Sequence, residues 1–169
     1  HLAGGVHDVH LRRRLRLRWH RTSSSTGGGE PGPCKPAGVA PEVMVGRGQV
    51  HYIAMNDGDR IQVVAPPQGG HVIWLAARQT GLEKTGSVTS ATGHMDELNL
   101  DMGPSDVPFA YEEDQGGYCV LYGLPLPIDD KHAVNDLLGK TMKVTIKVTD
   151  EDGDVGVGTR TVQLSDDIQ

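Results

Sequence analysis

The sequence is poor in aromatic residues and cysteines and contains no long apolar run. Only 4% of its 169 residues are Phe, Trp or Tyr, and its two cysteines are Cys34 and Cys119. Two cysteines define no framework, so one disulfide and two unrelated thiols are both compatible with the sequence. No stretch approaches the ~20 apolar residues of a membrane-spanning helix, so we expect no transmembrane segment.

Several catalytic and nucleotide-binding signatures are also missing. The chain has no GxSxG nucleophile elbow, and neither cysteine lies in a catalytic signature with His and Asn. No glycine-rich phosphate loop leads from a strand into a helix, and helix-periodic stretches are absent. These absences argue against covalent serine or cysteine catalysis and against nucleotide binding.

The charge is divided unevenly along the chain. The formal net charge is −6, yet residues 1–33 carry six arginines against Asp8 and Glu30, which leaves ten basic and twenty acidic residues in the remainder. An acidic body repels nucleic acid phosphates and anionic membranes. We therefore expect no nucleic acid partner, and cation binding or solubility suits this charge better.

The composition divides the chain into a tail and one domain. Residues 1–21 are rich in Arg and include His7 and His10, and residues 22–33, TSSSTGGGEPGP, form a Ser/Gly/Pro linker. We expect this basic tail to be poorly ordered. The domain then covers residues 34–169, a length sufficient for one core.

Abundant Gly and Pro (23 and 10 residues) and short apolar alternations predict an all-β domain. HVIWLAAR, residues 71–78, is the most hydrophobic segment and predicts a central strand with Trp74 in the core. A short helical turn is expected at 129–138, N-capped by Asp129 or Asp130 and closed by Gly139. The seven expected strands are 42–46, 60–65, 71–78, 97–101, 117–123, 140–149 and 155–164, with a weaker signal at 87–92.

The strongest single pattern is KTMKVTIKVTD near the C-terminus. Met142, Val144, Ile146 and Val148 alternate with polar residues, which is typical of a half-buried antiparallel strand. The EDGD turn then leads into residues 155–164, where glycines predict a bulge. The two segments are expected to form a terminal hairpin.

LxGK followed by VTIKVTDEDGDVG and a closing strand resembles the last two strands of bacterial immunoglobulin-like repeats. MVGRG, NDGD and PQGGHVIW resemble segments of uncharacterised secreted bacterial lipoproteins, and the Ser/Thr/Gly tract resembles the tethers of bacterial surface lipoproteins. The resemblance implies an antiparallel immunoglobulin-like β-sandwich of about seven strands in an extracytoplasmic protein. It implies no activity, and no lipobox precedes Cys34.

Acidic loops are expected at one end of such a sandwich. Alternation of seven strands places the loop before His71 together with the runs 112–114 and 150–154, which are rich in Asp and Glu. DxDGD is similar to the start of a calcium loop but lacks its glycine position and its distal Glu. Asp-Gly residues chosen for hairpin turns are the simpler interpretation.

Histidines are expected at the opposite end. The same alternation brings together His51, His94 beside Asp96, and His132, which lies near Asp129 and Asp130. Three imidazoles and a water are a catalytic zinc arrangement that supplies hydroxide for ester or phosphoester hydrolysis. Surface-loop histidines are the alternative, because no HExxH or similar spacing is present.

Two functional hypotheses follow from the sequence. The first is a non-enzymatic extracytoplasmic immunoglobulin-like module that binds a ligand or acts as a spacer. The second is a small zinc-dependent hydrolase of phospho- or carboxyl esters at the histidine-bearing end. Calcium at the acidic end is a third, lesser possibility for metal binding.

Overall fold

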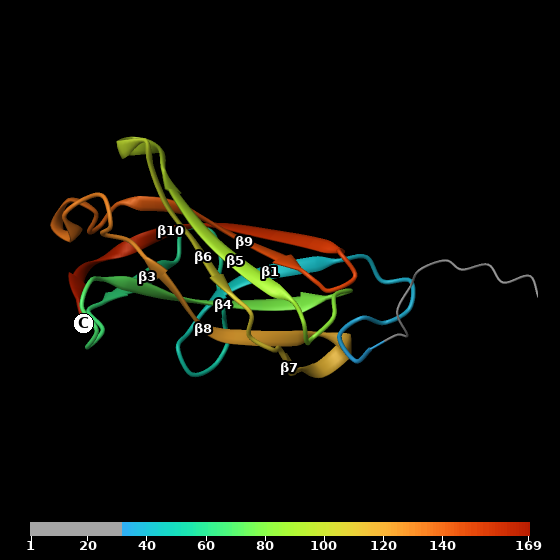
Figure 1. Ribbon diagram of the computed structural model, residues 1–169. Coiled ribbons are helices and arrows are strands. Elements are labelled where there is room, and N and C mark those ends of the chain that lie inside the picture. The colour runs from blue at the N-terminus through green and yellow to red at the C-terminus, as the bar shows by residue number, and fades with distance from the viewer. Residues whose placement is uncertain (1–31) are drawn as a thin grey trace, which may run out of the picture.

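The computed structural model describes residues 32–169, so the basic tail, with His7 and His10, lies outside the described residues. The described chain is all-β, with ten strands and three short 3₁₀ turns (Figure 1). The strands are β1 (Glu42–Arg47), β2 (Ile53–Ala54), β3 (Arg60–Val64), β4 (Val72–Thr80), β5 (Val88–Met95), β6 (Leu100–Val107), β7 (Glu112–Glu113), β8 (Cys119–Pro127), β9 (Thr141–Thr149) and β10 (Val155–Ile168). The turns are η1 (Asp96–Leu98), η2 (Gln115–Gly117) and η3 (Val134–Asp136).

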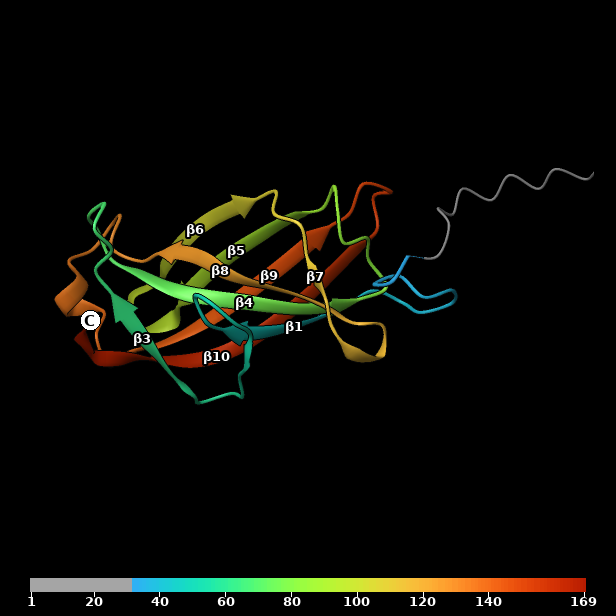
Figure 2. The same ribbon diagram turned by 90° about the horizontal axis from the view of Figure 1, so that it is seen from below.

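The ten strands belong to one open, mixed sheet that folds over on itself. One half contains β1, β4, β8 and β7, and the other contains β10, β9, β5 and β6. β3 joins the halves, because it pairs antiparallel with β4 and parallel with β10. Figures 1 and 2 show the two halves facing each other across the interior.

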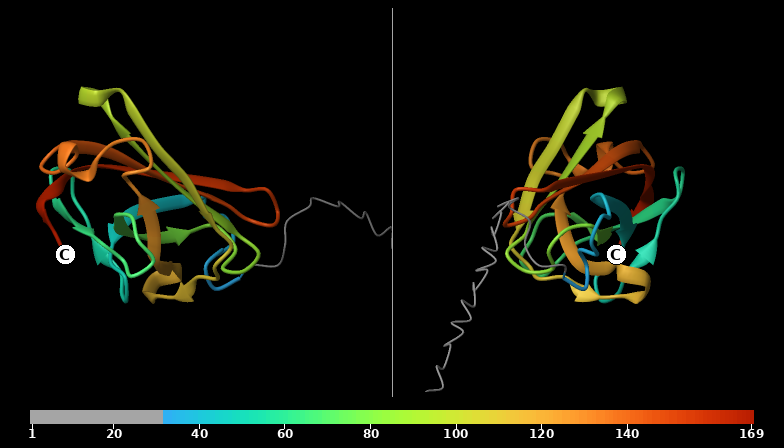
Figure 3. Two further views of the ribbon diagram at one scale, coloured as in Figure 1. Left: turned by 60° about the vertical axis from the view of Figure 1, so that its left-hand side comes forward. Right: turned by 90° about the vertical axis from the view of Figure 1, so that its right-hand side faces the viewer.

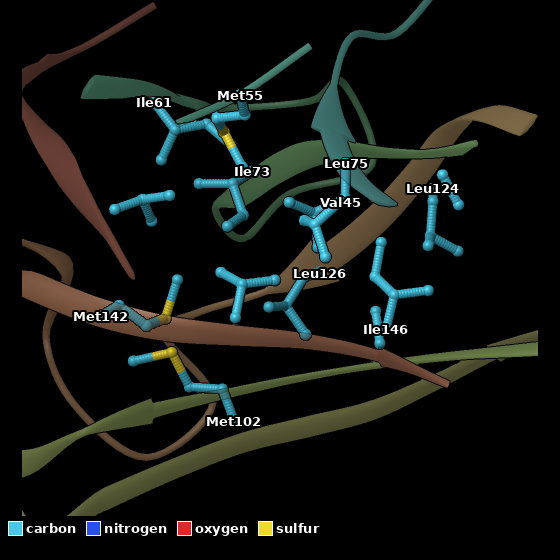
Figure 4. Close-up of a cluster of buried hydrophobic side chains, with 14 of the residues drawn as sticks. Val45, Met55, Ile61, Ile73, Leu75, Met102, Leu124, Leu126, Met142 and Ile146 are labelled. Atoms are coloured by element: carbon cyan, nitrogen blue, oxygen red, sulfur yellow. The ribbon is translucent and has the colours of Figure 1, made fainter. Parts of the chain in front are cut away.

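The hydrophobic core fills the space between the halves (Figure 4). Ile146 and Met142 from β9 meet Leu124 and Leu126 from β8, and all four are fully buried. The alternation expected in β9 is confirmed, since Met142, Val144, Ile146 and Val148 each have 0% exposure. Burial of these aliphatic side chains, each worth about 1.5–3 kcal/mol, is the main force that holds the halves together.

Two elements differ from the sequence prediction. Residues 97–101 are not one strand: the chain forms β5, the η1 turn and then β6, so the weaker signal at 87–92 marks a full strand. The expected helix at 129–138 is reduced to the η3 turn, and no side chain caps it. The N-cap position is Ala133, and the Asp129 carboxylate instead accepts hydrogen bonds from the backbone and ring of His71.

β4 is the central strand that its apolar run predicts, but Trp74 does not lie in the core. Ile73, Leu75 and Ala77 point inward and are fully buried, whereas Trp74 projects from the outer face and is partly exposed. The run looks continuous because Ala76 on the outer face is also fully buried, beneath another segment of the chain. The alternation of strand side chains therefore decides the position of Trp74.

The terminal hairpin of β9 and β10 forms as expected, but without a bulge at its glycines. The pairing is regular from Val155 to Gln163, and the register shifts only further on, between Leu164 and Ile168, where β10 meets β3. A Cβ on Gly158 would lie 2.2 Å from the Val43 carbonyl oxygen, and one on Gly156 would lie 2.7 Å from the Val43 side chain. These glycines let β1 approach β10 closely.

Cys34 and Cys119 form a disulfide with a Cα–Cα distance of 5.5 Å. Both residues are buried, and the bond ties the segment before β1 to the first residue of β8. A cross-link across 85 residues removes much of the conformational entropy of the unfolded chain.

Loss of this disulfide is expected to lower the free energy of unfolding by about 2–5 kcal/mol, because the unfolded chain regains its loop entropy. Urea denaturation of the oxidised protein and of the C34A/C119A variant measures the difference. A reducing agent should destabilise the wild type and leave the variant unchanged. Equal stability of the wild type in oxidised and reduced form would contradict the prediction.

Candidate functional site

The acidic β9–β10 turn is occupied by an internal cation. The Lys35 ammonium lies 2.9 Å from Asp150, 2.8 Å from Asp152 and 2.9 Å from Asp154. The Asp150 side chain is fully buried and also accepts hydrogen bonds from the backbone N–H groups of Glu83, Asp152 and Asp154. The run that resembles a calcium loop is therefore neutralised by a lysine from the same chain.

The pKa values of this cluster follow from its geometry. Burial opposes the charge on Lys35, but hydrogen bonds to Asp152, Asp150 and Asp154 outweigh it and raise the pKa of Lys35. Burial likewise favours the neutral form of Asp150, yet the Lys35 ammonium and the backbone donors of Glu83 and Asp154 hold the Asp150 pKa below its usual value of 3.8. Both groups are charged at neutral pH.

We expect Lys35→Met to destabilise the protein by about 3 kcal/mol at pH 7, because Asp150 would remain buried without its partner cation. A carboxyl group with a lowered folded-state pKa stabilises the protein above its unfolded pKa, and this contribution is lost as the pH falls through the folded value. In the wild type that loss begins only below about pH 4. In the variant the folded-state Asp150 pKa rises, so the gap below the unfolded value closes and the loss of stability on acidification becomes smaller than in the wild type.

Urea denaturation as a function of pH measures both effects, with Lys147→Met on the exposed side of β9 as the matched control. Similar stability and pH dependence in the two variants would contradict the role of the cluster.

The other acidic loop residues also have individual partners. Glu113 pairs with Lys84, Asp114 accepts a hydrogen bond from Arg78 at 2.7 Å, and Glu112 accepts one from the Tyr122 hydroxyl at 2.8 Å. Each of these carboxylates contacts a different partner, and they do not converge on one point. This supports their interpretation as turn and surface residues.

The expected distribution of loops between the two ends is partly wrong. The loops before β8 and after β9 do share one end, since Lys84 contacts Glu113 and the neighbouring Glu83 backbone bonds to Asp150. His71, however, lies at the opposite end, with its Nδ1 2.6 Å from the Asp129 carboxylate. The seven expected strands did not include the weaker signal at 87–92, which forms β5. Because successive strands run in opposite directions, one additional strand moves every earlier loop to the opposite end of the domain.

His71 and Asp129 form a polar pair between the start of β4 and the end of β8. Both side chains are about one fifth exposed. Burial raises the Asp129 pKa, but hydrogen bonds from the His71 ring and backbone outweigh this and lower it. Within residues 32–169, no serine, threonine or cysteine hydrogen-bonds to the His71 ring, so the pair lacks the nucleophile of a hydrolytic triad.

The histidines of the predicted zinc site lie on different parts of the fold. His94, at the end of β5, contacts Asp101 at 2.7 Å through Nδ1 and Asp96 at 3.1 Å through Nε2. The hydrogen bond to Asp101 raises the His94 pKa. His51 belongs to the segment that packs over β4 and β8, in the other half of the sheet, and His132 is an exposed residue before η3.

Figure 3 shows the η1 turn, next to His94, projecting away from the half that contains β4 and β8. Within the described chain, no three His, Cys, Asp or Glu residues are grouped so as to hold a metal ion. The structure therefore brings Asp96 to His94 but does not assemble the zinc ligands His51, His94 and His132.

The outer face of β4 and β8 is a surface that the sequence analysis missed. We define the aromatic face as Tyr52, Trp74, Arg78, Tyr118 and Tyr122. The Arg78 guanidinium stacks 4.1 Å from the centroid of the Tyr118 ring. All five side chains are partly exposed, and Phe109 lies beside Tyr122 in a neighbouring depression of about 200 Å³.

Two phenol groups of this face, those of Tyr52 and Tyr122, have raised pKa values. Burial raises the Tyr52 pKa, although nearby Arg78 opposes the shift, and the hydrogen bond to Glu112 raises the Tyr122 pKa. The Tyr52 hydroxyl therefore keeps its proton at neutral pH, whereas the Tyr122 hydroxyl already donates its proton to Glu112.

A cleft of about 180 Å³ opens beside Trp74. It forms where one edge of β4 changes its pairing partner. β1 pairs with this edge up to Leu75, and β3 pairs with it from Ile73 towards the start of β4. Trp74 lies between these two pairings. The remaining walls come from Arg47, Gly48, Gln49, Ile53, Ile61, Gln62, Val64 and Gln169.

Three glycines let the segment after β1 cross the outer face of β4 (Figure 2). The Gly48 N–H donates to the Trp74 carbonyl at 3.1 Å, and the Gly48 carbonyl accepts from Gly123 on β8 at 2.9 Å. Gly46 leaves space for the Tyr52 ring, since a Cβ there would lie 2.4 Å from the ring. Gly48 and Gly123 both adopt positive φ, which glycine permits at little cost.

No protein-family model matches the chain, and no curated protein matches it. Within residues 32–169, no helix is long and apolar enough to cross a membrane.

Proposed function

We propose that the chain is an extracytoplasmic immunoglobulin-like domain that binds its ligand through the aromatic face. One observation carries the proposal: of the six aromatic side chains in residues 32–169, only Tyr111 is buried, and the other five lie on or beside this face. A sequence so poor in aromatic residues thus places all but one of those in residues 32–169 outside the core and together on one surface.

The chemistry of the face supports binding. Tyr, Trp and Arg are enriched at the centres of protein recognition sites, where they contribute most of the affinity. The opposite outer face, on β9 and β10, instead presents lysines and threonines, including Lys143, Thr145, Lys147 and Thr159. Such residues are typical of a solvated sheet surface.

The strand order supports the immunoglobulin-like type. The half β1-β4-β8-β7 corresponds to strands A-B-E-D, and β10-β9-β5-β6 corresponds to G-F-C-C′. The parallel pairing of β3 with β10 corresponds to a first strand that divides between the two sheets. The η3 turn lies between the strands that correspond to E and F.

The disulfide supports an extracytoplasmic location, because such bonds persist in oxidising compartments and are rare in reducing ones. If the proposal holds, alkylation of free thiols in intact producing cells should leave Cys34 and Cys119 unmodified until a reductant is added. Mass spectrometry of the isolated protein measures this. Two alkylated cysteines without reduction would contradict the location.

The aromatic face should determine affinity for the extracellular protein and polysaccharide fractions of the producing cells. We expect W74A/Y118A to weaken binding to the recognised fraction by about thirtyfold or more, since a single hot-spot side chain contributes about 2 kcal/mol or more. T145A/K147A, on the opposite face, is the matched control and should leave binding unchanged. Biolayer interferometry with each immobilised fraction measures both variants. Equal losses in the two variants, or a loss only in the control, would refute binding through this face.

A further inference from the structure

We infer that the cleft beside Trp74 binds a neutral saccharide, one ring of which lies against the indole. The inference rests on the proposed function and names the ligand class of the same face. It depends on the polarity of the cleft walls, on their charge, on the size of the cleft and on an indole donor that lacks a partner.

The walls combine a flat apolar surface with planar polar groups. Trp74, Ile53 and Val64 supply the apolar surface, and Arg47, Gln49 and Gln62 supply guanidinium and amide groups. A pyranose ring matches both, because its C–H bonds contact an aromatic ring while its hydroxyls both donate and accept hydrogen bonds. The Gln62 amide nitrogen already donates to Val63, Ser165 and Asp167, so a purely apolar ligand would leave chiefly the Gln49 amide without a partner, at a cost in affinity.

The charge of the cleft points to a neutral ligand. Arg47 is the only wall residue with a charged side chain, and its guanidinium already donates to the Arg60 carbonyl. No Asp or Glu side chain lines the cleft to attract a cation. Anionic ligands meet long-range repulsion, because residues 34–169 carry ten basic and twenty acidic residues.

The volume fits a single ring. About 180 Å³ corresponds to the liquid volume of roughly six water molecules at ~30 Å³ each, which is the scale of one monosaccharide unit. A longer glycan then continues along the outer face, where Tyr52 and Tyr118 offer further aromatic surface. A proline-rich peptide would need an extended aromatic groove rather than a single compact cleft.

Trp74 supplies an unused hydrogen-bond donor. Its Nε1 is buried and has no acceptor among the described residues. Most buried donors in proteins have an acceptor, and an unpaired one is unfavourable. A saccharide hydroxyl is the kind of acceptor that this donor lacks within the described chain.

Titration of the ¹⁵N-labelled protein with neutral oligosaccharides tests the inference. The panel contains oligomers of glucose, mannose, galactose and N-acetylglucosamine, and NMR follows the Trp74 indole N–H signal. We expect one class to shift this signal saturably, and Trp74→Ala to weaken binding of that class at least tenfold. Trp74→Phe keeps a flat ring without the donor, so it should retain part of the affinity and control for folding.

Lys147→Ala, on the opposite face, should bind like the wild type. The inference is overturned if no neutral oligosaccharide shifts the indole signal, or if Trp74→Ala binds as tightly as the wild type. A proline-rich peptide that shifts the signal in place of the sugars would also overturn it, while leaving the aromatic face as a binding surface. Failure of the proposed function is separate: there, W74A/Y118A would bind the extracellular fractions no more weakly than T145A/K147A.

Discussion

The structure depends on which strands form backbone hydrogen bonds with the two edges of β4. One edge pairs with β8, and the other is shared between β1 and β3. Because β3 also pairs with β10, this shared edge is the hydrogen-bonded link between the two halves of the sheet. The core can then close between Leu124 and Ile146, which belong to opposite halves. The same change of partner opens the cleft at Trp74, so fold and candidate site have one origin.

Local patterns predicted the strands better than their spatial arrangement. The alternation of Met142, Val144, Ile146 and Val148 encodes a half-buried strand, because the period of two is a property of the backbone. The pairing of β3 with β10 depends on residues about a hundred positions apart, and no local signal encodes it. One missed strand, β5, was enough to place His71 at the wrong end of the molecule.

The candidate site was hidden for a similar reason. Trp74 lies in an apolar run, HVIWLAAR, and such a run predicts burial on both faces of a strand. That prediction was correct for Ala76, which another segment covers, and wrong for Trp74, which lies at the margin of that cover. The small residues Gly46, Gly48 and Gly123 were the available signal, since glycines in strands mark close approach of another backbone.

The two ends of the domain have different polar contacts. At one end, Lys35 and the disulfide fix the N-terminal segment against the β9–β10 turn and the start of β8. At the other, His71 and Asp129 link β4 to the segment after β8. The carboxylates of the β9–β10 turn at the first end are thereby occupied by the chain's own lysine. The proposed ligand site lies apart from both ends, on the broad surface of the sheet.

The position of the disulfide also governs how the domain responds to mechanical load. Force applied to the chain ahead of Cys34 passes directly to Cys119 through the covalent bond, so β1 to β7 lie inside a closed loop of 85 residues and are shielded from extension. The bond shortens the maximum reach of a stretched chain by roughly 290 Å, at about 3.4 Å for each residue in the loop. A domain cross-linked by a disulfide at this position extends less under shear force than the same chain without the bond.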